Sequence, residues 1–353
     1  MLRSLPPGEF ECHVAVPSDP PLRAELEAAG VSIHIVPMRR ISTSHGAIAW
    51  AAYALGWPLA VARLVRLVRR LRIDVLQTNS LHSWYGWATA ALTRRPHVWS
   101  AREIVVQSSA ALRVERFLTR HFATRVVCGS QAIADQLHPH NVIVVYETAD
   151  PSEFHPGRAG RARARLTIPD DAPLAGSAGR IDTWKGIDVL LDAWPRAKAA
   201  LPRLHLAIAG GPVQGKEAYA AQLEQRAAEL ADVHWLGELD ASHVADLVAD
   251  LDVLVVASTE PEPYGLIAVE ALMSGTPVVA TDAGGPQEIL AAAYPGGGRL
   301  VALGDAGALA DAIAATAGAA TSTATRRARS PLLEPAPEQM AEVFRAASGT
   351  RRR

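Results

Sequence analysis

Short apolar runs alternate with helical segments along the whole of the 353-residue chain. The runs are rich in Val, Ile, Leu and Ala without polar alternation, which is typical of strands buried on both faces of a parallel sheet. In the first half, strands are expected at residues 11–17, 31–37, 73–79, 97–101, 125–130 and 142–147. In the second half, they are expected at 174–179, 204–210, 232–237, 252–258, 277–281 and 299–303. Two successive sets of βα units predict an α/β chain with two doubly wound, Rossmann-like domains.

The stretch 157–173, GRAGRARARLTIPDDAP, is the expected boundary between the domains because it is rich in Gly, Pro and Arg. The formal charge changes sign there: residues 1–166 carry 20 basic and 12 acidic residues, whereas residues 167–353 carry 15 basic and 24 acidic residues. We therefore predict a first domain over 1–166, a second domain over 167–330, and a C-terminal helix with a basic tail over 331–353. The opposite charges indicate different partners for the two domains.

Composition excludes several classes of protein. With 49% hydrophobic and 20% charged residues the chain is not disordered, and its net charge of −1 favours no nucleic-acid partner. The two cysteines, Cys12 and Cys128, are far apart and fit no metal spacing, and the first ten residues contain no apolar signal core, so a reducing cytoplasmic location is expected. The uncharged stretch 46–62 is short for a membrane span and is expected to pack within its domain.

The segment 258–289, STEPEPYGLIAVEALMSGTPVVATDAGGPQEI, carries the strongest sign of chemistry. A buried strand ends at Ser258, and a helix is expected to begin near Tyr264. The first N–H groups of a helix have no partner within it and can hold an anion or a sugar hydroxyl. Glu262 and Glu270 are about two helical turns apart, so both can face one side, where carboxylates accept hydrogen bonds from vicinal hydroxyls. Alternatively, Glu262 caps the helix and Glu270 is a solvated surface charge.

A second segment, GRIDTWKGIDVLLDAW at 179–194, places two cations at the end of a strand. Arg180 and Lys185 flank a loop that leads into a helix starting near Gly186. Two cations beside a helix N-terminus make a diphosphate site, and these two lie in a half that is otherwise acidic. The alternative is a pair of ordinary surface cations. The next strand ends in AGGP at 209–212, whose glycines allow the backbone to approach a ligand closely.

Together these blocks resemble the retaining, sugar-nucleotide-dependent glycosyltransferases of family 4. That family has the GT-B fold, in which two Rossmann-like domains face each other across a cleft. The match consists of the Gly-Arg and Lys-Gly pairs at 179–186, AGGP, WLGEL at 235–239, and EPYG followed by Glu270 and GTPVVAT within 262–281. It is dense over about residues 170–305 and looser over 11–156.

The resemblance implies a site for a nucleoside-diphosphate sugar, which is a substrate; no cofactor and no metal is implied. Arg180 and Lys185 would hold the diphosphate. Glu270 would bind the ribose diol, and Glu262 the hydroxyls of the transferred sugar. The other implied contacts are backbone groups of Tyr264, Gly265 and Leu266 for sugar and phosphate, and of Leu239 for the base.

The first half resembles the acceptor domain of the family, with three departures. Many members have His-Asp near the end of the fourth strand, where this chain has Arg102-Glu103. The family's Asn-Gly-x-Asp loop is Glu-Thr-Ala-Asp at 147–150. The family's first strand and Gly-rich loop have no counterpart before the strand at 11–17. We therefore expect the first domain to lack one central strand, which would leave backbone groups of the sheet unpaired.

Three further patterns have structural explanations. Asp250 and Asp252 have a metal-like Asp-x-Asp spacing but lie at a helix-to-strand junction, so a structural role is expected. His82 and His121 show no metal spacing and are expected in packing or at the surface, with an acceptor contact as the alternative for His82. Residues 59–72, LAVARLVRLVRRLR, predict an amphipathic basic helix. It either covers the sheet or docks on the anionic inner face of a membrane or on a phospholipid-linked acceptor.

The expected function is the transfer of a sugar from a nucleoside-diphosphate sugar to a hydroxyl acceptor, with retained anomeric configuration and without a metal. Fixed cations and helix N–H groups would stabilise the charge on the departing diphosphate. No enzymic nucleophile is evident; the candidates for a catalytic role are Glu262, Arg102 and Glu103. The alternative is a non-catalytic or truncated GT-B subunit that binds a sugar nucleotide or a partner enzyme.

Overall fold

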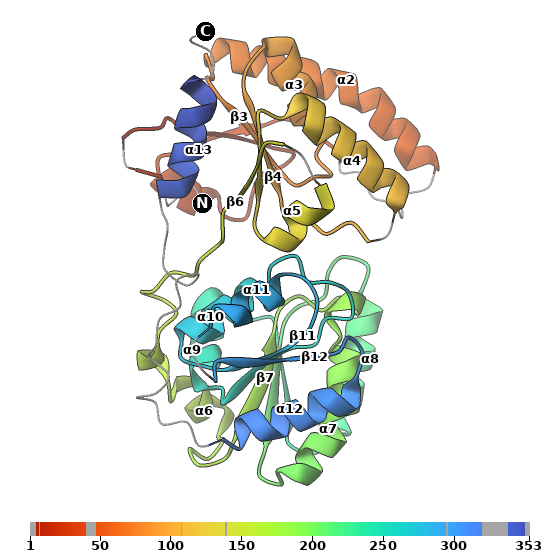
Figure 1. Cartoon of the computed structure of the whole chain (residues 1–353), viewed down its shortest axis with the longest axis vertical. Coiled ribbons are helices and arrows are strands. Elements are labelled where there is room, and N and C mark those ends of the chain that lie inside the picture. Colours follow the sequence, from red (N-terminus) through yellow and green to blue (C-terminus); the bar gives the residue numbers. More distant parts are fainter. Residues whose placement is uncertain are drawn as a thin grey trace. The chain divides into compact units, whose positions relative to one another are not determined.

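The computed structural model describes residues 5–6, 8–39, 47–106, 108–137, 140–293, 296–319 and 338–349. The chain divides into two compact units, one formed by residues 1–145 and 336–353 and the other by residues 146–335 (Figure 1). Each unit is an α/β unit with parallel sheets. All twelve predicted strands are present within one to three residues of their expected ends.

The second unit contains one six-stranded parallel sheet in the order β12-β11-β10-β7-β8-β9. Its strands are β7 (Leu174–Ala178), β8 (His205–Ala209), β9 (Val233–Gly237), β10 (Val253–Val256), β11 (Val278–Thr281) and β12 (Gly298–Val301). Its α-helices are α6 (Arg161–Leu166), α7 (Ile187–Ala200), α8 (Glu217–Ala228), α9 (Ala241–Asp250), α10 (Leu266–Met273), α11 (Gly285–Ala291) and α12 (Ala306–Ala317). The 3₁₀ turns are η2 (Pro156–Arg158) and η3 (Thr183–Lys185).

Both faces of this sheet are covered, which explains its unbroken apolar strands. In β10, Val253 and Val255 pack toward α7, α8 and α12, whereas Leu254 and Val256 pack toward α9, α10 and α11. Figure 1 shows α7 and α12 on one side of the sheet and α9 to α11 on the other. Successive residues of a strand point to opposite faces, so a strand without polar residues requires a helical layer on each side.

The strand order of the second unit locates its ligand-binding edge. From β7 the chain proceeds outward through β8 and β9, and then returns to the opposite side of β7 to form β10, β11 and β12. The order therefore reverses between β7 and β10. In open α/β sheets, ligands bind outside the carboxyl ends of the strands at such a switch point. The loops that follow β7 and β10 are therefore the ones that shape a binding crevice.

The first unit has the same kind of layers but two separate sheets. Strands β1 (His13–Val16) and β2 (Ser32–Ile35) pair with each other, and β3 (Leu76–Asn79), β4 (His97–Ala101), β5 (Arg125–Cys128) and β6 (Val142–Val144) form a second sheet in that order. Its helices are α1 (Arg23–Ala28), α2 (Ala47–Arg70), α3 (Tyr85–Thr93), α4 (Ser109–Phe122), α5 (Gln131–Leu137) and α13 (Glu338–Gly349). Val126 and Cys128 of β5 face α5, whereas Val127 faces α13.

The division into two sheets bears on the expected missing strand. Among the described residues, no hydrogen bond joins the sheet of β1 and β2 to the sheet of β3 to β6, and none of residues 5–6 and 8–12 belongs to a strand. A six-stranded first domain is thus observed. The lack of a central strand stays a prediction, because two unjoined sheets do not show what would lie between them.

Helix α2 differs from the sequence expectation in its length. The sequence predicts an uncharged stretch at 46–62 and a separate amphipathic helix at 59–72, but one 24-residue helix runs through Gly56 and Pro58. Tyr53, Ala60 and Leu64 are all buried in one apolar cluster, so the packed face continues on both sides of the proline. Tertiary packing therefore outweighs the lost hydrogen bond at Pro58. The expected packing of the uncharged stretch is met only in part, because Tyr53, Ala60 and Val61 are buried whereas Leu55 and Leu59 are exposed.

Two parts of the chain lie in different units from those predicted. The second unit starts at residue 146 instead of 167. The C-terminal helix, expected as a separate part within 331–353, packs on β4 of the first unit through Met340 and Val343. The basic tail that follows this helix is outside the described residues. Contacts between segments distant in sequence determine which unit each of these two parts joins. Amino-acid composition does not reveal such contacts.

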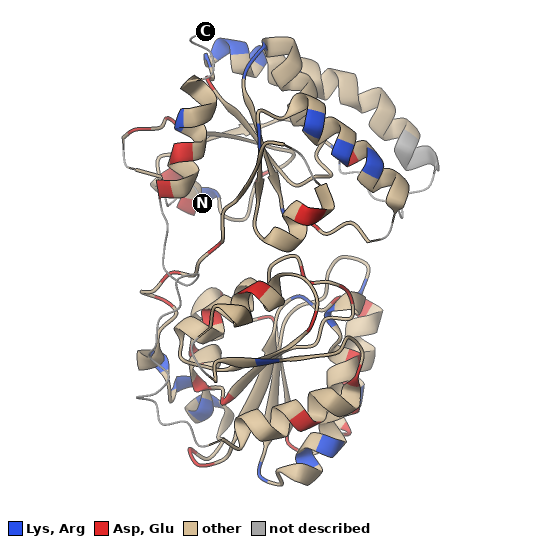
Figure 2. Cartoon of the chain, viewed as in Figure 1, with Lys and Arg blue, Asp and Glu red and all other residues tan. Residues whose placement is uncertain are grey.

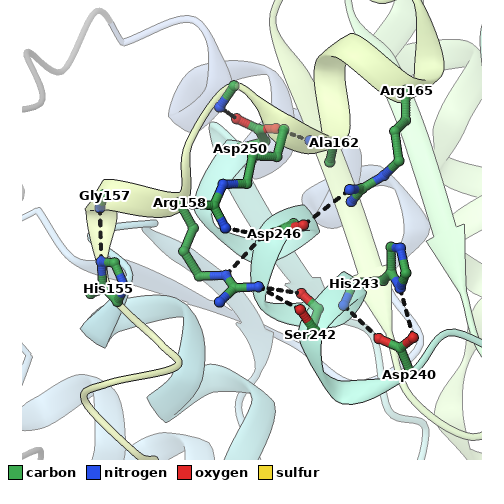
Figure 3. A network of polar contacts seen from close by, with 12 residues as sticks. His155, Gly157, Arg158, Ala162, Arg165, Asp240, Ser242, His243, Asp246 and Asp250 are labelled. Carbon is green, nitrogen blue, oxygen red and sulfur yellow. Dashed lines mark hydrogen bonds and ion pairs between the residues drawn. The ribbon is translucent and has the colours of Figure 1, made fainter.

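A polar network fixes residues 155–166 to the second unit (Figure 3). Asp246 on α9 is only 5% exposed and accepts hydrogen bonds from Arg158 at 2.8 Å and Arg165 at 3.0 Å. Asp250 accepts from the backbone N–H groups of Gly160, Ala162 and Arg163 at the start of α6. These bonds satisfy donors that the first turn of a helix leaves unpaired.

The same network explains the Asp-x-Asp spacing, as predicted. Asp252 accepts from Arg163 and from the N–H group of Leu174, so it joins α6 to β7. Among the described residues, no group of three or more His, Cys, Asp or Glu side chains gathers as metal ligands would. Asp250 and Asp252 thus hold the start of the second unit together.

We expect Arg163→Ala to destabilise the second unit by about 2–4 kcal/mol, because Arg163 is 7% exposed and also donates to the carbonyls of Ala172 and Asp250. Hydrogen exchange of peptides from β7 and β10 measures this change in the second unit alone. Arg161→Ala is the matched control, because its side chain is 55% exposed and its ion pair with Asp246 is long. Equal effects of the two substitutions would contradict this role of Arg163.

Candidate functional site

The loops after β7 and β10 meet at the switch point of the second unit. The N–H group of Thr259 donates to the carbonyl of Trp184 at 2.8 Å. Gly186 has a φ of +66°, and a Cβ atom there would lie 1.9 Å from the carbonyl oxygen of Ala257. The sequence requires glycine at this position because a side chain would separate the two loops. The cation-bearing loop and the loop with Glu262 therefore form one surface.

The Glu262 carboxylate joins these loops through charge. Its Oε2 atom lies 2.7 Å from Nζ of Lys185 and accepts a hydrogen bond from Oγ of Ser258 at 2.8 Å. Glu262 is 6% exposed and Ser258 is fully buried. The ammonium group of Lys185 also lies 4.2 Å from the centre of the Trp184 ring. The lysine is thus held at the crevice before any ligand arrives.

The backbone around Glu262 is fixed by a second tight contact. The N–H group of Gly285 donates to the carbonyl of Glu262 at 2.8 Å, and Gly284 has a φ of +79° with no room for a Cβ atom. Helix α10 begins just beyond, with Gly265 as its N-cap at a φ of +92°. Gly265 has no side chain to cap the helix, and Ala268 N–H donates to its carbonyl at 2.8 Å, so the N–H group of Leu266 is the one that faces an anion or hydroxyl without a side-chain cap.

Tyr264 anchors the start of α10. Its hydroxyl donates to the carbonyl of Glu147 at 2.6 Å, and burial is the main cause that raises its pKa above the usual range. Tyr146 packs beside Tyr264 and donates to Glu288 on α11 at 3.0 Å. Residues 146–147, which follow β6, therefore hold Tyr264 and α11 in place. Helix α10 starts two residues later than predicted, so the side chain of Tyr264 precedes the helix.

Arg180 lies on the loop after β7, which also carries Lys185, and Leu239 lies on the loop after β9. Arg180 is exposed and forms no ion pair with any described residue, which leaves its guanidinium available to a phosphate. Gly210 has a φ of +155°, and a Cβ atom there would lie 1.8 Å from the carbonyl oxygen of Gly179. The AGGP loop thus packs directly on the Gly-Arg loop. Leu239, which follows β9, is half-buried against the core.

Glu270 on α10 has a raised pKa. Burial, followed by the nearby charge of Glu153, raises its pKa from 4.5 to about 7. No described cation neutralises it. Glu262 lies in the loop before α10 and Glu270 lies on α10; that both face one side stays a prediction. A carboxyl group kept without a partner is a hydrogen-bond acceptor for a bound ligand.

The acceptor-side candidates belong to the first unit. Oε2 of Glu103 accepts from the N–H groups of Leu81 and Arg102 at 3.0 and 3.1 Å, so this carboxylate braces the loops after β3 and β4. Arg102 is exposed beside it. His82, after β3, is bonded through Nδ1 to the buried Glu115 at 2.8 Å. His82 thus lies at the surface as expected, with 47% of its side chain exposed, and Glu115 orients its ring.

Sequence inspection missed three supporting groups of the site. Ser258 was treated only as a strand end, although its hydroxyl fixes Glu262. Tyr146 and Glu147 were assigned to the first domain, although they contact α10 and α11. No local spacing signals these contacts. The pairing of Tyr146 with a glutamate 142 residues away in sequence is visible only after folding.

Two family models match the chain, one over each unit. Residues 1–146 match the glycosyl transferase 4-like domain, and residues 160–317 match the glycosyl transferases group 1 domain. A D-inositol 3-phosphate glycosyltransferase of Stackebrandtia nassauensis is 34% identical over 248 residues, 61% of this chain and 55% of the relative. That of Mycolicibacterium gilvum is 35% identical over 58% of this chain and 51% of the relative. The chain spans about half the length of these relatives.

Solved structures support the same architecture. Anabaena Alr3699/HepE in complex with UDP-glucose has a TM-score of 0.69 at 23% identity, with 95% of this chain and 91% of that chain covered. Sucrose-phosphate synthase from Thermosynechococcus elongatus has a TM-score of 0.66 at 22% identity, with 92% and 88% covered. At these identities the likeness shows the fold. The chain thus has the GT-B fold, and each of its two Rossmann-like units is similar to a glycosyltransferase domain.

Proposed function

We propose that the chain transfers a sugar from a nucleoside-diphosphate sugar to a hydroxyl acceptor, with retention of the anomeric configuration and without a metal ion. The observation that carries this proposal is the ion pair of Lys185 and Glu262 at the switch point between β7 and β10, with Arg180 exposed on the loop that also carries Lys185. Two cations and a carboxylate at that place suit a ligand with a phosphate end and a hydroxyl-bearing end.

The sugar nucleotide would be held in three parts. Arg180 and Lys185 would bind the diphosphate, and backbone groups of Tyr264, Gly265 and Leu266 would contact phosphate and sugar. Glu262 would accept hydrogen bonds from the hydroxyls of the transferred sugar. Leu239 would lie beside the base through its backbone. The neighbouring structures of HepE contain UDP and UDP-glucose, so UDP-glucose is the first ligand to test.

Charge stabilisation would supply most of the catalysis. As the sugar leaves, negative charge grows on the diphosphate, and fixed cations stabilise this charge without reorganisation. Lys185 is already oriented by Glu262 and Trp184, so little ordering is required when the ligand binds. No residue is assigned the role of an enzymic nucleophile; without one, retention requires the acceptor oxygen to attack the anomeric carbon from the face that the diphosphate leaves.

Glu270 would accept hydrogen bonds from the two ribose hydroxyls. Its side chain is half-buried and forms no ion pair with a described residue, and its pKa is near 7, so binding of hydroxyl donors would favour the ionised form. The diol would thereby replace the solvation that folding removes. Ligand binding would thus account for a carboxyl group at this position of α10, where a neutral Gln side chain would cost less free energy on folding.

The acceptor would bind on the first unit. The loops after β3 and β4 present Arg102, Glu103 and His82, which are polar groups held in place by neighbouring bonds. The relatives named above act on D-inositol 3-phosphate, so this compound is the first acceptor to test. A lipid-linked alcohol is the second class to test.

The alternative function is a non-catalytic subunit that binds a sugar nucleotide or a partner enzyme. The two unjoined sheets of the first unit favour it. Incubation with UDP-glucose, followed by NMR detection of transferred or hydrolysed glucose, separates the two functions. Binding with turnover and an α-configured product supports the enzyme, whereas tight binding without any turnover supports the alternative.

We expect Glu270→Gln to lower the affinity for UDP-glucose roughly 10- to 100-fold, because the charge that strengthens the hydrogen bonds to ribose is removed. In the wild type, affinity should fall by about tenfold from pH 8 to pH 6, as Glu270 becomes protonated, and the variant should be insensitive over this range. Calorimetric titration measures both. An unchanged affinity in the variant would remove Glu270 from the site.

The same substitution should make the protein more stable at neutral pH. A carboxyl group with a folded-state pKa of about 7 and a usual value of 4.5 favours folding below the lower value, and this contribution is lost as the pH rises toward 7. At about pH 8, Glu270→Gln should therefore raise the free energy of unfolding by about 2–3 kcal/mol, with no gain near pH 4.5. Glu224→Gln on the exposed side of α8 is the control. A pH-independent difference would contradict the raised pKa.

We expect the affinity for UDP-glucose to survive an excess of EDTA, because cationic side chains and the N-terminus of α10 meet the phosphate charge. The measurement is the same titration, performed with and without the chelator. Complete loss of binding on chelation, restored by magnesium or manganese, would show that a metal ion is part of the site.

A further inference from the structure

Helix α2 has one packed face and one face that no described element covers. Tyr53, Val61, Leu64 and Val68 are buried against the first unit. On the opposite side, Leu55 is 82% exposed and Leu59 is 55% exposed. Two leucines one turn apart on a solvent-facing helix are an unusual placement of apolar surface.

The exposed face continues into a row of arginines. Positions 55, 59, 63, 66 and 70 are three or four residues apart and lie along one side of the helix over about 22 Å. Arg63, Arg66 and Arg70 are all exposed on this side. Figure 2 shows α2 tan over most of its length, with its blue residues toward the C-terminal end and no red residue. The face is thus apolar at one end and cationic at the other.

These arginines lack acidic partners. No ion pair joins Arg63, Arg66 or Arg70 to any described carboxylate, whereas Arg158 and Arg163 in the second unit are paired with Asp246 and Asp252. The first unit, residues 1–145 and 336–353, carries 20 arginines and 11 acidic residues. Its excess positive charge is therefore uncompensated on this face, and an anionic partner would complement it.

A groove beside α2 extends the same surface. It has a volume of about 490 Å³ and is lined by Arg63, Arg66 and Arg70, with Arg23 and His34 opposite them. Its apolar floor includes Ile35 of β2, which is 52% exposed. The arginines of this groove suit a phosphate-bearing headgroup, while Leu55 and Leu59, farther along the same face of α2, suit contact with acyl chains.

We propose that this surface, made of the exposed face of α2 and the adjoining groove, docks the first unit on an anionic phospholipid membrane. Leu55 and Leu59 enter the boundary between headgroups and acyl chains, and Arg63, Arg66 and Arg70 bind lipid phosphates. The segment Ala51–Arg70 is also long and apolar enough to cross a bilayer. Its packed face and its arginine row favour a helix that lies on the membrane.

A membrane suits this surface better than a soluble anion does. A small phosphate compound would need the arginines but would leave Leu55 and Leu59 in water. The linear succession of leucines and arginines along one helix matches an interface that is apolar on one side and charged on the other. The proposal is independent of the sugar-transfer activity, because none of these residues belongs to the site on the second unit.

The test is sedimentation of the full chain with vesicles of phosphatidylglycerol and phosphatidylcholine, or of phosphatidylcholine alone. Binding is expected only to the anionic vesicles and should weaken as salt is raised. Each arginine near such a surface contributes roughly a fivefold factor, so Arg66→Gln with Arg70→Gln should weaken binding roughly 25-fold. The matched control is Arg113→Gln with Arg120→Gln, two exposed arginines on α4, which should change binding little.

The apolar part has its own pair of variants. Leu55→Ser with Leu59→Ser should weaken vesicle binding even at high salt, whereas Leu92→Ser with Val114→Ser, which are exposed elsewhere on the first unit, should not. Equal losses for test and control variants, no binding to anionic vesicles, or equal binding to both vesicle types would overturn the proposal. Displacement of vesicles by free inositol phosphate would also overturn it, since the groove would then be a site for a soluble anion. Circular dichroism melts verify that each variant is folded.

Discussion

The ion pair between Lys185 and Glu262 joins the two loops on which the rest of the second unit's site depends. These loops come from strands that are neighbours in the sheet but distant in sequence, β7 and β10. A nearly buried carboxylate requires compensation, and Lys185 and the hydroxyl of Ser258 supply it. The ligand-facing cation and carboxylate are thus fixed by each other. A site of this kind is preorganised because the bonds that hold it also satisfy its buried charge.

Much of this arrangement is predictable from the sequence because it follows from local chemistry. Unbroken apolar runs indicate covered parallel strands, and the motifs at 179–186 and 262–265 indicate the loops that carry Lys185 and Glu262. The contacts of Tyr146 and Glu147 were not predictable, because they depend on which unit the segment after β6 packs against. The continuous helix through Pro58 was missed for a similar reason: its buried face, not its propensity, decides the structure.

Arginine serves two physical purposes in this chain. In residues 155–166, Arg158, Arg163 and Arg165 are paired with carboxylates of the second unit and hold it together. Along α2, Arg63, Arg66 and Arg70 face solvent and form no ion pair with a described carboxylate. Counting basic residues along the sequence does not separate these cases. Asp246 on α9 and Asp252 just before β10 neutralise one group, and nothing described neutralises the other.

Hydrogen exchange with mass spectrometry tests the central claim most directly, namely that one crevice of the second unit binds the sugar nucleotide. On addition of UDP-glucose, peptides that cover η3 with the start of α7, and the loop from Ser258 into α10, should become protected together, because the ligand would bridge both loops. Peptides from α12, on the far layer, should remain unchanged. Binding of UDP-glucose without protection of these two segments would contradict the account.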